Sequence, residues 1–293
     1  MANLKEVRIR IASIKSTRQI TSAMKMVSAS KLRKGQTAIQ NLRPYEEQLR
    51  LTLNKINNVL SEKDKNSLCI QHPSPKNVLF IVITANKGLC GTFNSHLLKA
   101  SLKHIHKLGQ QGLDVELLVI GKKAQDFFRK TSYKVFEVHN ELIDKVTVED
   151  AFAMARKAMN LINEKRFHKI DLIYNRFRNA AVYEIISEQF LPLVLPEQVL
   201  EEEEAPEVEY IMEPSRKELM DELVPKSIQT YFYRVLLDSY ASEQGARMTA
   251  MHKATDNATE LLKNLTIAYN KARQTSITNE IVEIVGGAEA LDA

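Results

Sequence analysis

The sequence predicts a mixed α/β fold in which two very long helices, one at each end of the chain, flank a compact α/β domain. Apolar residues recur at helical spacing near both ends of the chain. Between these ends, short β-branched runs alternate with helical stretches, which is typical of a mostly parallel sheet. Aromatic residues make up only 6% of the chain and Trp is absent. This composition favours long helices over a β-sandwich or barrel.

The N-terminal helix is predicted over residues 1–60. Its apolar residues start with the alternating three- and four-residue spacing of a coiled-coil seam, at Leu4, Val7, Ile11 and Ile14. After an interruption at 16–19 the seam is expected to resume through Ile20, Met24 and Val27. It then meets a basic break at Lys31 and continues to Leu60. Because proline removes a backbone hydrogen bond and clashes with the preceding turn, we expect a kink or a break at Pro44.

The compact α/β domain is predicted over residues 77–195, after a polar linker at 61–76. Its first strand, 78–84, is a continuous apolar run of the kind that is buried on both faces of a parallel sheet. The elements expected after it are helices at 94–107, 122–130 and 148–165, and strands at 115–120, 133–138, 169–174 and 181–186. The last two strands are expected to pair as a hairpin.

An acidic linker is predicted over residues 196–214, with an edge strand expected at 208–212, and the C-terminal helix over 215–293. Gly286 and Gly287 are the expected helix stop. The apolar seam of this helix is partial, at Leu219, Leu223, Val235, Leu261, Leu265, Ile281 and Ile284. Small residues replace it over 241–258 and permit close approach of a neighbouring backbone. Since neither terminal helix can bury its apolar stripe alone, we expect the two to pair as an antiparallel coiled coil.

Charge is distributed unevenly along the chain. The net charge is +5, but the first thirty-four residues carry nine Lys and Arg against one acidic residue. This asymmetry indicates an acidic partner for the N-terminal helix. The alternative is a solvated helix face with no partner.

Catalytic and cofactor-binding templates fail in this sequence. The glycine turn at 86–91 lies where a phosphate loop would lie, but it matches neither the P-loop nor the dinucleotide-binding spacing. The seven histidines lack metal-ligand spacing, and two cysteines are too few for a zinc site or a disulfide framework. We therefore expect no catalytic residue, cofactor or metal, and a chain that acts as a lever or shaft.

Three long stretches are specific enough to identify a family: IASIKSTRQITSAMKMVSASKLRK at 11–34, ASEQGARMTAM followed by ATDN at 241–257, and YNKARQTSITNEI at 269–281. They resemble the N-terminal and C-terminal helices of the ATP synthase gamma subunits. The turn KGLCG at 87–91 and Asn94 resemble the central domain of that family. The resemblance covers the chain from end to end. It implies an antiparallel coiled coil with a Rossmann-like α/β domain that binds no nucleotide.

The resemblance also implies a function and a set of partners. In that family the coiled coil stands inside a ring of three alpha and three beta subunits, and its base contacts the epsilon subunit and the c-subunit ring. Proton flow turns the ring and the shaft with it, which drives ATP synthesis on the beta subunits. The implied location is the cytoplasmic face of a bacterial inner membrane, peripheral, with membrane contact only through the complex. The missing leader and the missing plastid-type cysteine insert agree with a bacterial chain.

Matching positions imply six coupling residues. Arg273, Gln274 and Thr278 correspond to family residues that contact a catch loop of the beta subunit. Met24, Lys25 and Arg247 correspond to the neck, where the shaft faces an acidic helix-loop-helix of beta. The small residues of the C-terminal helix are expected to form a surface that slips between equivalent partners.

Two other functions remain as alternatives. The basic N-terminal helix is compatible with nucleic-acid binding, although residues 1–44 contain none of the aromatic residues expected beside such a surface. A nucleotide-dependent enzyme built on the central domain is the other alternative, and the failed glycine templates count against it.

Overall fold

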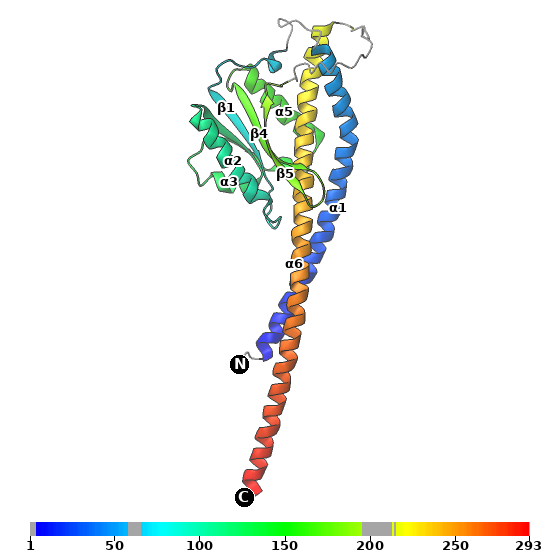
Figure 1. The fold of residues 1–293 in the computed structure, drawn as a ribbon, viewed down its shortest axis with the longest axis vertical. Coiled ribbons are helices and arrows are strands. Elements are labelled where there is room, and N and C mark those ends of the chain that lie inside the picture. Colours follow the sequence, from blue (N-terminus) through cyan, green and yellow to red (C-terminus); the bar gives the residue numbers. More distant parts are fainter. Residues whose placement is uncertain (1–3, 58–65, 195–212, 214, 293) are drawn as a thin grey trace, which may run out of the picture. The chain divides into compact units, whose positions relative to one another are not determined.

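The computed structural model describes residues 4–57, 66–194, 213 and 215–292. The chain divides into two compact units, Met1–Ser28 with Arg247–Ala293, and Ala29–Ala246, and each is described by itself. Helices α1 (Leu4–Asn57) and α6 (Arg216–Asp292) contribute to both units (Figure 1). The two long terminal helices are therefore confirmed. Within the described residues, no helix is both long and apolar enough to cross a bilayer.

The unit Ala29–Ala246 is built on a five-stranded sheet in the order β3-β2-β1-β4-β5. Its strands are β1 (Asn77–Ile83), β2 (Asp114–Ile120), β3 (Val135–His139), β4 (Lys169–Phe177) and β5 (Tyr183–Leu191). The pairs β1–β2, β1–β4 and β2–β3 are parallel, whereas β4 and β5 pair as an antiparallel hairpin. The five expected strands and the hairpin are confirmed.

Helices cover both faces of this sheet. Helices α2 (Phe93–Gln110) and α3 (Lys122–Phe128) pack on one face, and α5 (Val148–Asn163) packs on the other with α1 and α6 (Figure 1). Two short elements were not expected: the 3-10 turn η2 (Ser67–Cys69) and the single-turn helix α4 (Glu141–Asp144). Strand β1 is fully buried from Val78 to Ile83, with alternate side chains in the cores on opposite faces. Its uninterrupted apolar sequence therefore reflects a central strand.

The glycine turn after β1 is held by side-chain to backbone hydrogen bonds. Asn94 Oδ1 accepts from the Ala85 N–H at 3.0 Å, and Asn86 Oδ1 accepts from the Lys122 N–H at 2.8 Å. Gly121, at the end of β2, has φ +100°, and a Cβ there would lie 2.2 Å from the Thr84 carbonyl oxygen. These contacts join the ends of β1 and β2, which supports a structural role for the turn.

Small residues of α6 let neighbouring backbones approach closely within this unit. A Cβ on Gly35 of α1 would lie 3.4 Å from the Ala241 Cβ, and a Cβ on Gly245 would lie 2.8 Å from the Ala180 carbonyl oxygen. Residues 241–245 are all buried. The predicted close approach is confirmed here. The same burial removes these residues from any slipping surface, because they pack against their own chain.

The predicted glycine stop of the C-terminal helix is wrong. Helix α6 continues through Gly286 and Gly287 to Asp292, and neither glycine adopts a positive φ. Glycine in a helix costs about 1 kcal/mol relative to Ala, and the Ala and Leu residues that follow favour helix strongly enough to continue it. Helix α1 runs unbroken through Pro44, so a break there is wrong, and a kink stays a prediction. Since Pro44 and Gln40 are both exposed, water can satisfy the Gln40 carbonyl that proline leaves without a donor.

The predicted division into 1–60, 77–195, 196–214 and 215–293 stays a prediction. The acidic linker and its edge strand at 208–212 lie outside the described residues, apart from Glu213.

Candidate coupling surface on the paired helices

The seam of α1 is an uninterrupted heptad pattern. In the unit Met1–Ser28 with Arg247–Ala293 it consists of the half-buried or buried residues Leu4, Val7, Ile11, Ile14, Arg18, Thr21, Lys25 and Ser28. The same three- and four-residue spacing continues in the other unit, through Leu32, Gly35, Ile39, Leu42, Glu46, Leu49, Leu53 and Ile56. The predicted interruption at 16–19 and the break at Lys31 are therefore wrong. Ile20 and Val27 are 60% and 56% exposed, so they lie off the seam.

The reason for this error is chemical. Seam positions from Arg18 to Ser28 carry polar or small side chains, so a search for apolar residues leaves the seam at Ile20. The seam is set by spacing alone through this stretch. Polar residues at seam positions lower the stability of a coiled coil but specify its register.

A pair of threonines provides the polar layer. Thr21 Oγ1 donates to the Arg18 carbonyl at 3.1 Å, so it is the acceptor for Thr255 Oγ1 at 2.9 Å. The single hydroxyl proton of Thr255 is shared between Thr21 and the Met251 carbonyl at 2.8 Å. This layer joins α1 and α6 in the middle of the paired segment.

A second polar contact joins the helices near the start of α1. Arg8 Nη2 donates to Tyr269 Oη at 2.8 Å, and its guanidinium lies 5.7 Å from the centre of the tyrosine ring. Passing from Arg8 to Thr21 along α1 moves the partner on α6 back from Tyr269 to Thr255. The helices are therefore antiparallel in this unit, as predicted.

The seam of α6 in this unit differs from the predicted one. Its buried or half-buried positions are Met251, Thr255, Ala258, Leu262, Leu265, Tyr269, Ala272 and Ser276. Leu265 was predicted correctly. Leu261, Ile281 and Ile284 are exposed by 49%, 55% and 71%, so their assignment to the seam is wrong. Leu262 occupies the position assigned to Leu261.

The paired helices leave a shallow groove of about 430 Å³ beside the threonine layer, between Arg18, Gln19, Ser22, Ala23, Met26, Thr255 and Thr259. Small side chains at Ser22 and Ala23 leave this space open. Met26 is 65% exposed. The groove is a place where another chain can approach the backbone of both helices.

The residues predicted at the neck lie around this polar stretch. Lys25 is a half-buried seam residue, and Met24 beside it is also half-buried. Lys25 has no ion pair among the described residues. Arg247 is only 8% exposed and makes an interaction within its own chain. An aliphatic stem can stay packed while a cationic group reaches a partner, so the predicted contacts of these residues stay predictions.

The residues predicted at the catch loop lie near and beyond the last contacts with α1. Arg273, Gln274 and Thr278 are all exposed on α6, C-terminal to Tyr269. Thr278 Oγ1 donates to the Gln274 carbonyl at 2.9 Å, so these two side chains share one helix face. Within the described part of the chain, Arg273 has no ion pair. Its five N–H donors are therefore available to acceptors on another molecule.

Apolar side chains are also exposed along the end of α6. They are Ile277, Ile281, Val282, Ile284 and Val285, each at least 48% exposed. Isolated exposed apolar residues are ordinary, but a cluster of this kind marks an interaction surface. The end of α6 thus presents apolar side chains together with the cation Arg273 and the acidic residues Glu280 and Glu283.

A buried charge network, which sequence reasoning missed, fixes α1 and α6 to the sheet in the unit Ala29–Ala246. Arg234 of α6 lies 2.7 Å from Glu46 Oε1 of α1 and 3.4 Å from Asp238 Oδ2. Burial raises the pKa of Asp238 to about 6, although Arg234 opposes the shift. Burial also raises the pKa of Glu46. From the sequence alone these charged residues would be placed on the surface, because only the packing of α6 on the sheet buries them.

The sheet contributes to the same region. Tyr174 Oη donates to Glu188 Oε1 at 2.7 Å and accepts from Arg176 Nη2 at 3.3 Å. Burial raises the pKa of Tyr174 to about 12. The guanidinium of Arg234 lies 4.8 Å from the Tyr231 ring. The charges of the network are paired as ions, Arg234 with Glu46 and Asp238, and Arg176 with Glu188. Within the described residues, the buried Nε atoms of Arg176 and Arg234 make no hydrogen bond.

A cluster of polar side chains, which the sequence analysis also did not predict, lies between α2 and the β4–β5 hairpin. Ser187 Oγ and Asp171 Oδ2 lie 3.1 and 3.4 Å from the two ring nitrogens of His104. Lys169 Nζ donates to the same Asp171 oxygen at 3.0 Å. Lys169 and His104 thus lie against the buried Asp171 carboxylate and compensate its burial.

Comparison with known proteins decides the family. The family described as "ATP synthase" matches residues 3–291. The chain is 48% identical over 292 residues to the "ATP synthase gamma chain" of Christiangramia forsetii, and 48% identical to that of Flavobacterium johnsoniae, with 100% of each chain covered. The chain belongs to the ATP synthase gamma-chain family.

Solved structures support the same fold. A chain of a Euglena gracilis mitochondrial ATP synthase aligns with a TM-score of 0.64 and 20% identity, over 98% of this chain and 94% of that one. A chain described with the central stalk and c-ring of the Tetrahymena thermophila enzyme has a TM-score of 0.55 and 25% identity, over 80% of this chain and 99% of that one. The gamma-chain fold of paired long helices and a mostly parallel sheet is thus shared with these proteins.

Proposed function

We propose that this gamma-family chain is the rotor shaft of an F-type ATP synthase. It transmits rotation of a proton-driven c ring to catalytic sites on the beta subunits, and so couples proton flow to ATP synthesis. The observation that carries this proposal is the 48% sequence identity to two bacterial gamma chains over the full length of this chain. Its partners are three alpha and three beta subunits, the epsilon subunit and the c ring. The chain contributes no catalytic residue, and its location is the cytoplasmic face of a bacterial inner membrane, peripheral.

The helix pair has the properties that this role requires. A shaft must keep the register of its two helices, because a slip of one heptad moves them by about 10 Å relative to each other. The threonine layer and the Arg8–Tyr269 contact specify one register. The side chains between the two helices are only partly buried in this segment. Its outer surface is therefore available for contact with the partner subunits.

We assign the coupling contacts to the two groups of exposed or half-buried residues described above. Arg273, Gln274 and Thr278 engage the beta-subunit catch loop through their side-chain donors and acceptors. Met24, Lys25 and Arg247 face an acidic region of beta at the neck. The basic excess of the N-terminal helix supports an acidic partner, and nucleic acid is not among the proposed partners.

Reconstitution tests the shaft role. The full chain is mixed with alpha and beta subunits, a filament is attached to the α/β domain, and ATP hydrolysis and filament rotation are recorded. Stepwise rotation driven by ATP is expected. A soluble, folded chain that neither assembles nor stimulates hydrolysis would contradict the proposal.

A substitution at the helix end tests the residue assignment. Arg273→Ala should reduce rotation-coupled activity about tenfold, the typical effect of losing a hydrogen bond to a charged group. Lys263→Ala is the matched control, because Lys263 is also an exposed cation on α6 but lies within the paired segment. Equal effects of the two substitutions would remove Arg273 from the coupling site.

A further inference from the structure

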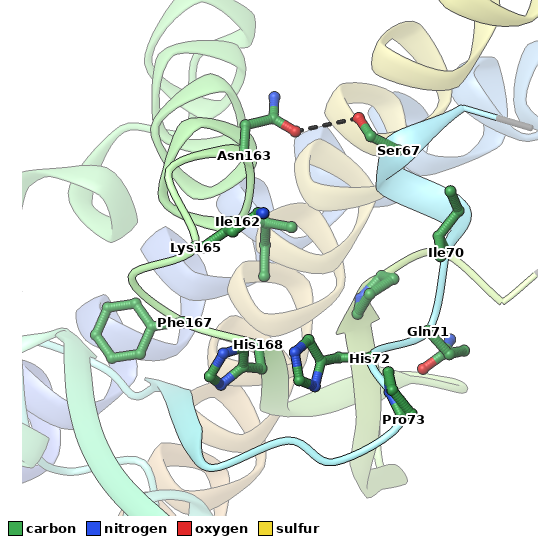
Figure 2. Close-up of a pocket in the computed structure, with 11 residues that line it drawn as sticks. Ser67, Ile70, Gln71, His72, Pro73, Ile162, Asn163, Lys165, Phe167 and His168 are labelled. Atoms are coloured by element: carbon green, nitrogen blue, oxygen red, sulfur yellow. Dashed lines mark hydrogen bonds between the residues drawn. The ribbon is translucent and has the colours of Figure 1, made fainter.

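A cavity of about 330 Å³ lies on the unit Ala29–Ala246, at the opposite end of β1 and β4 from the glycine turn. Residues 70–73 after η2 form one side, and residues 162–168, from the end of α5 into the connection to β4, form another (Figure 2). Pro192 after β5 completes the lining. Its size is at the lower end of the range of about 300–1,000 Å³ that is typical of ligand pockets. None of its residues belongs to the proposed coupling surface.

Two histidine rings lie side by side in this cavity. The rings of His72 and His168 have centroids 4.2 Å apart and are tilted by 42° (Figure 2). The Lys76 and Asn77 N–H groups donate to His168 Nδ1 at 3.2 and 3.3 Å, and the Ser74 N–H donates to His72 Nδ1 at 3.2 Å. Because each Nδ1 accepts a hydrogen bond, it carries no proton. Each neutral ring therefore carries its proton on Nε2.

Protonation of His168 is unfavourable. A proton on His168 Nδ1 would face two backbone N–H donors, and His72 and Lys76 add like charge. Burial, then His72 and Lys76, lower the pKa of His168. The hydrogen bonds to Nδ1 leave Nε2–H of each ring as a donor, and neither donor has an acceptor within the described residues. A metal ion does not fit, since coordination needs an Nε2 that carries no proton.

The remaining lining combines an apolar wall with a cation. Ile70, Ile162, Phe167 and Pro192 supply the apolar surface, and Lys165 supplies a positive charge (Figure 2). Lys165 has φ +57°, a left-handed conformation that is uncommon for a residue other than glycine. Donors without an acceptor, a cation and an apolar wall together match an anionic head on a short hydrocarbon body.

We propose that this cavity binds a small amphipathic carboxylate. The carboxylate accepts hydrogen bonds from Nε2–H of His72 and His168 near the Lys165 ammonium, and the hydrocarbon body packs against Ile70, Ile162 and Pro192. The inference concerns the α/β domain alone and stands independently of the shaft role.

Calorimetry on the full chain tests this site with octanoate as the probe. Octanoate should bind, and octanol, which has the same hydrocarbon length without the charge, should bind at least tenfold more weakly. His72→Phe keeps a ring but removes the donor, and should weaken octanoate binding about tenfold. His106→Phe is the matched control, because His106 is an exposed histidine of α2 outside this cavity. It should leave octanoate affinity unchanged.

Four results would overturn the proposal: no binding of octanoate by the folded chain, equal binding of octanol, an unchanged affinity in His72→Phe, or tighter binding of Zn²⁺ than of octanoate. Measurements at pH 8 add a further requirement. Donation from Nε2–H does not require a charged ring, so octanoate should still bind at pH 8. Binding that appears only on acidification would contradict the proposed hydrogen bonds from Nε2–H.

Discussion

One heptad seam of α1 is buried to different degrees in the two units of the chain. In the unit Ala29–Ala246 its positions include Leu49, Leu53 and Ile56, which are at most 8% exposed and belong to the main core. In the unit Met1–Ser28 with Arg247–Ala293 the equivalent positions include Arg18, Thr21 and Lys25, which are only half-buried. The heptad spacing is the same in both units, but the seam side chains are more deeply buried in the unit Ala29–Ala246.

This difference separates two functions of one helix. The apolar half is stabilised by its own chain, through the core and the Arg234 network. The polar half has a defined register but little internal stabilisation, which suits a segment that is enclosed by other subunits. Each prediction below tests whether the two halves differ as much in energy as in chemistry.

The largest difference is expected from core truncation. Leu53→Ala should lower the free energy of unfolding by about 2–5 kcal/mol, because Leu53 is 1% exposed and leaves a cavity. Leu262→Ala, at a half-buried seam position of the other unit, should cost about 1 kcal/mol or less. Urea unfolding of the full chain measures both values. Equal losses would mean that the polar half is stabilised as firmly as the core.

A second difference is expected in the response to pH. The folded-state pKa of Asp238 is about 6, above the value of about 3.9 in an unfolded chain. Folding therefore favours protonated Asp238, and its contribution to stability is full below pH 4 and is lost as pH rises through 6. Relative to Asp238→Asn, the unaltered chain should lose up to about 3 kcal/mol between pH 4 and pH 8. Unfolding measured across this range provides the test, and parallel pH profiles of the two chains would exclude a buried, titrating Asp238.

A smaller effect is expected from the threonine layer. Thr21→Val with Thr255→Val replaces both partners by apolar groups of similar shape, which should change unfolding free energy by less than about 1 kcal/mol. The register of the two helices should instead become less uniquely defined. A Val pair can pack in several alignments, whereas the hydroxyl pair forms its hydrogen bond in only one. Spin-label distances between α1 and α6 in this unit measure the alignment. A distribution as narrow as that of the unaltered chain would show that Arg8 and Tyr269 suffice.

Sequence predicted most of this architecture because its signals are local. The apolar run of β1 and the alternation that follows it determine strand and helix order without tertiary information. Helix pairing followed from the spacing that starts at Leu4. The coupling residues came from the family motifs, and no contact within the chain tests them.

The missed features depend on tertiary context. Arg18, Thr21 and Lys25 are seam residues only because the heptad continues past them, so a search by hydropathy moved to Ile20. Asp238 and Glu46 became a buried network only through packing of α6 on the sheet. The assignment of Nε2–H as the donor of His72 and His168 depends on backbone N–H groups that bond to Nδ1, and no sequence motif predicts their positions.

The smallest effect concerns the end of α6, where the expected glycine stop is absent. Gly286 and Gly287 have open space around them, with nothing within 4 Å of an added Cβ. Gly286→Ala should therefore strengthen the helix by up to about 1 kcal/mol, since Ala has the higher helix propensity and meets no clash. Amide hydrogen exchange over residues 280–292 measures this local stability. The same substitution at Gly245, where a Cβ meets the Ala180 carbonyl oxygen at 2.8 Å, should destabilise the chain. Opposite signs would confirm that a glycine in α6 serves close packing in one unit and only lowers helix stability in the other. Unchanged exchange over residues 280–292 in Gly286→Ala would contradict the expected gain in helix stability.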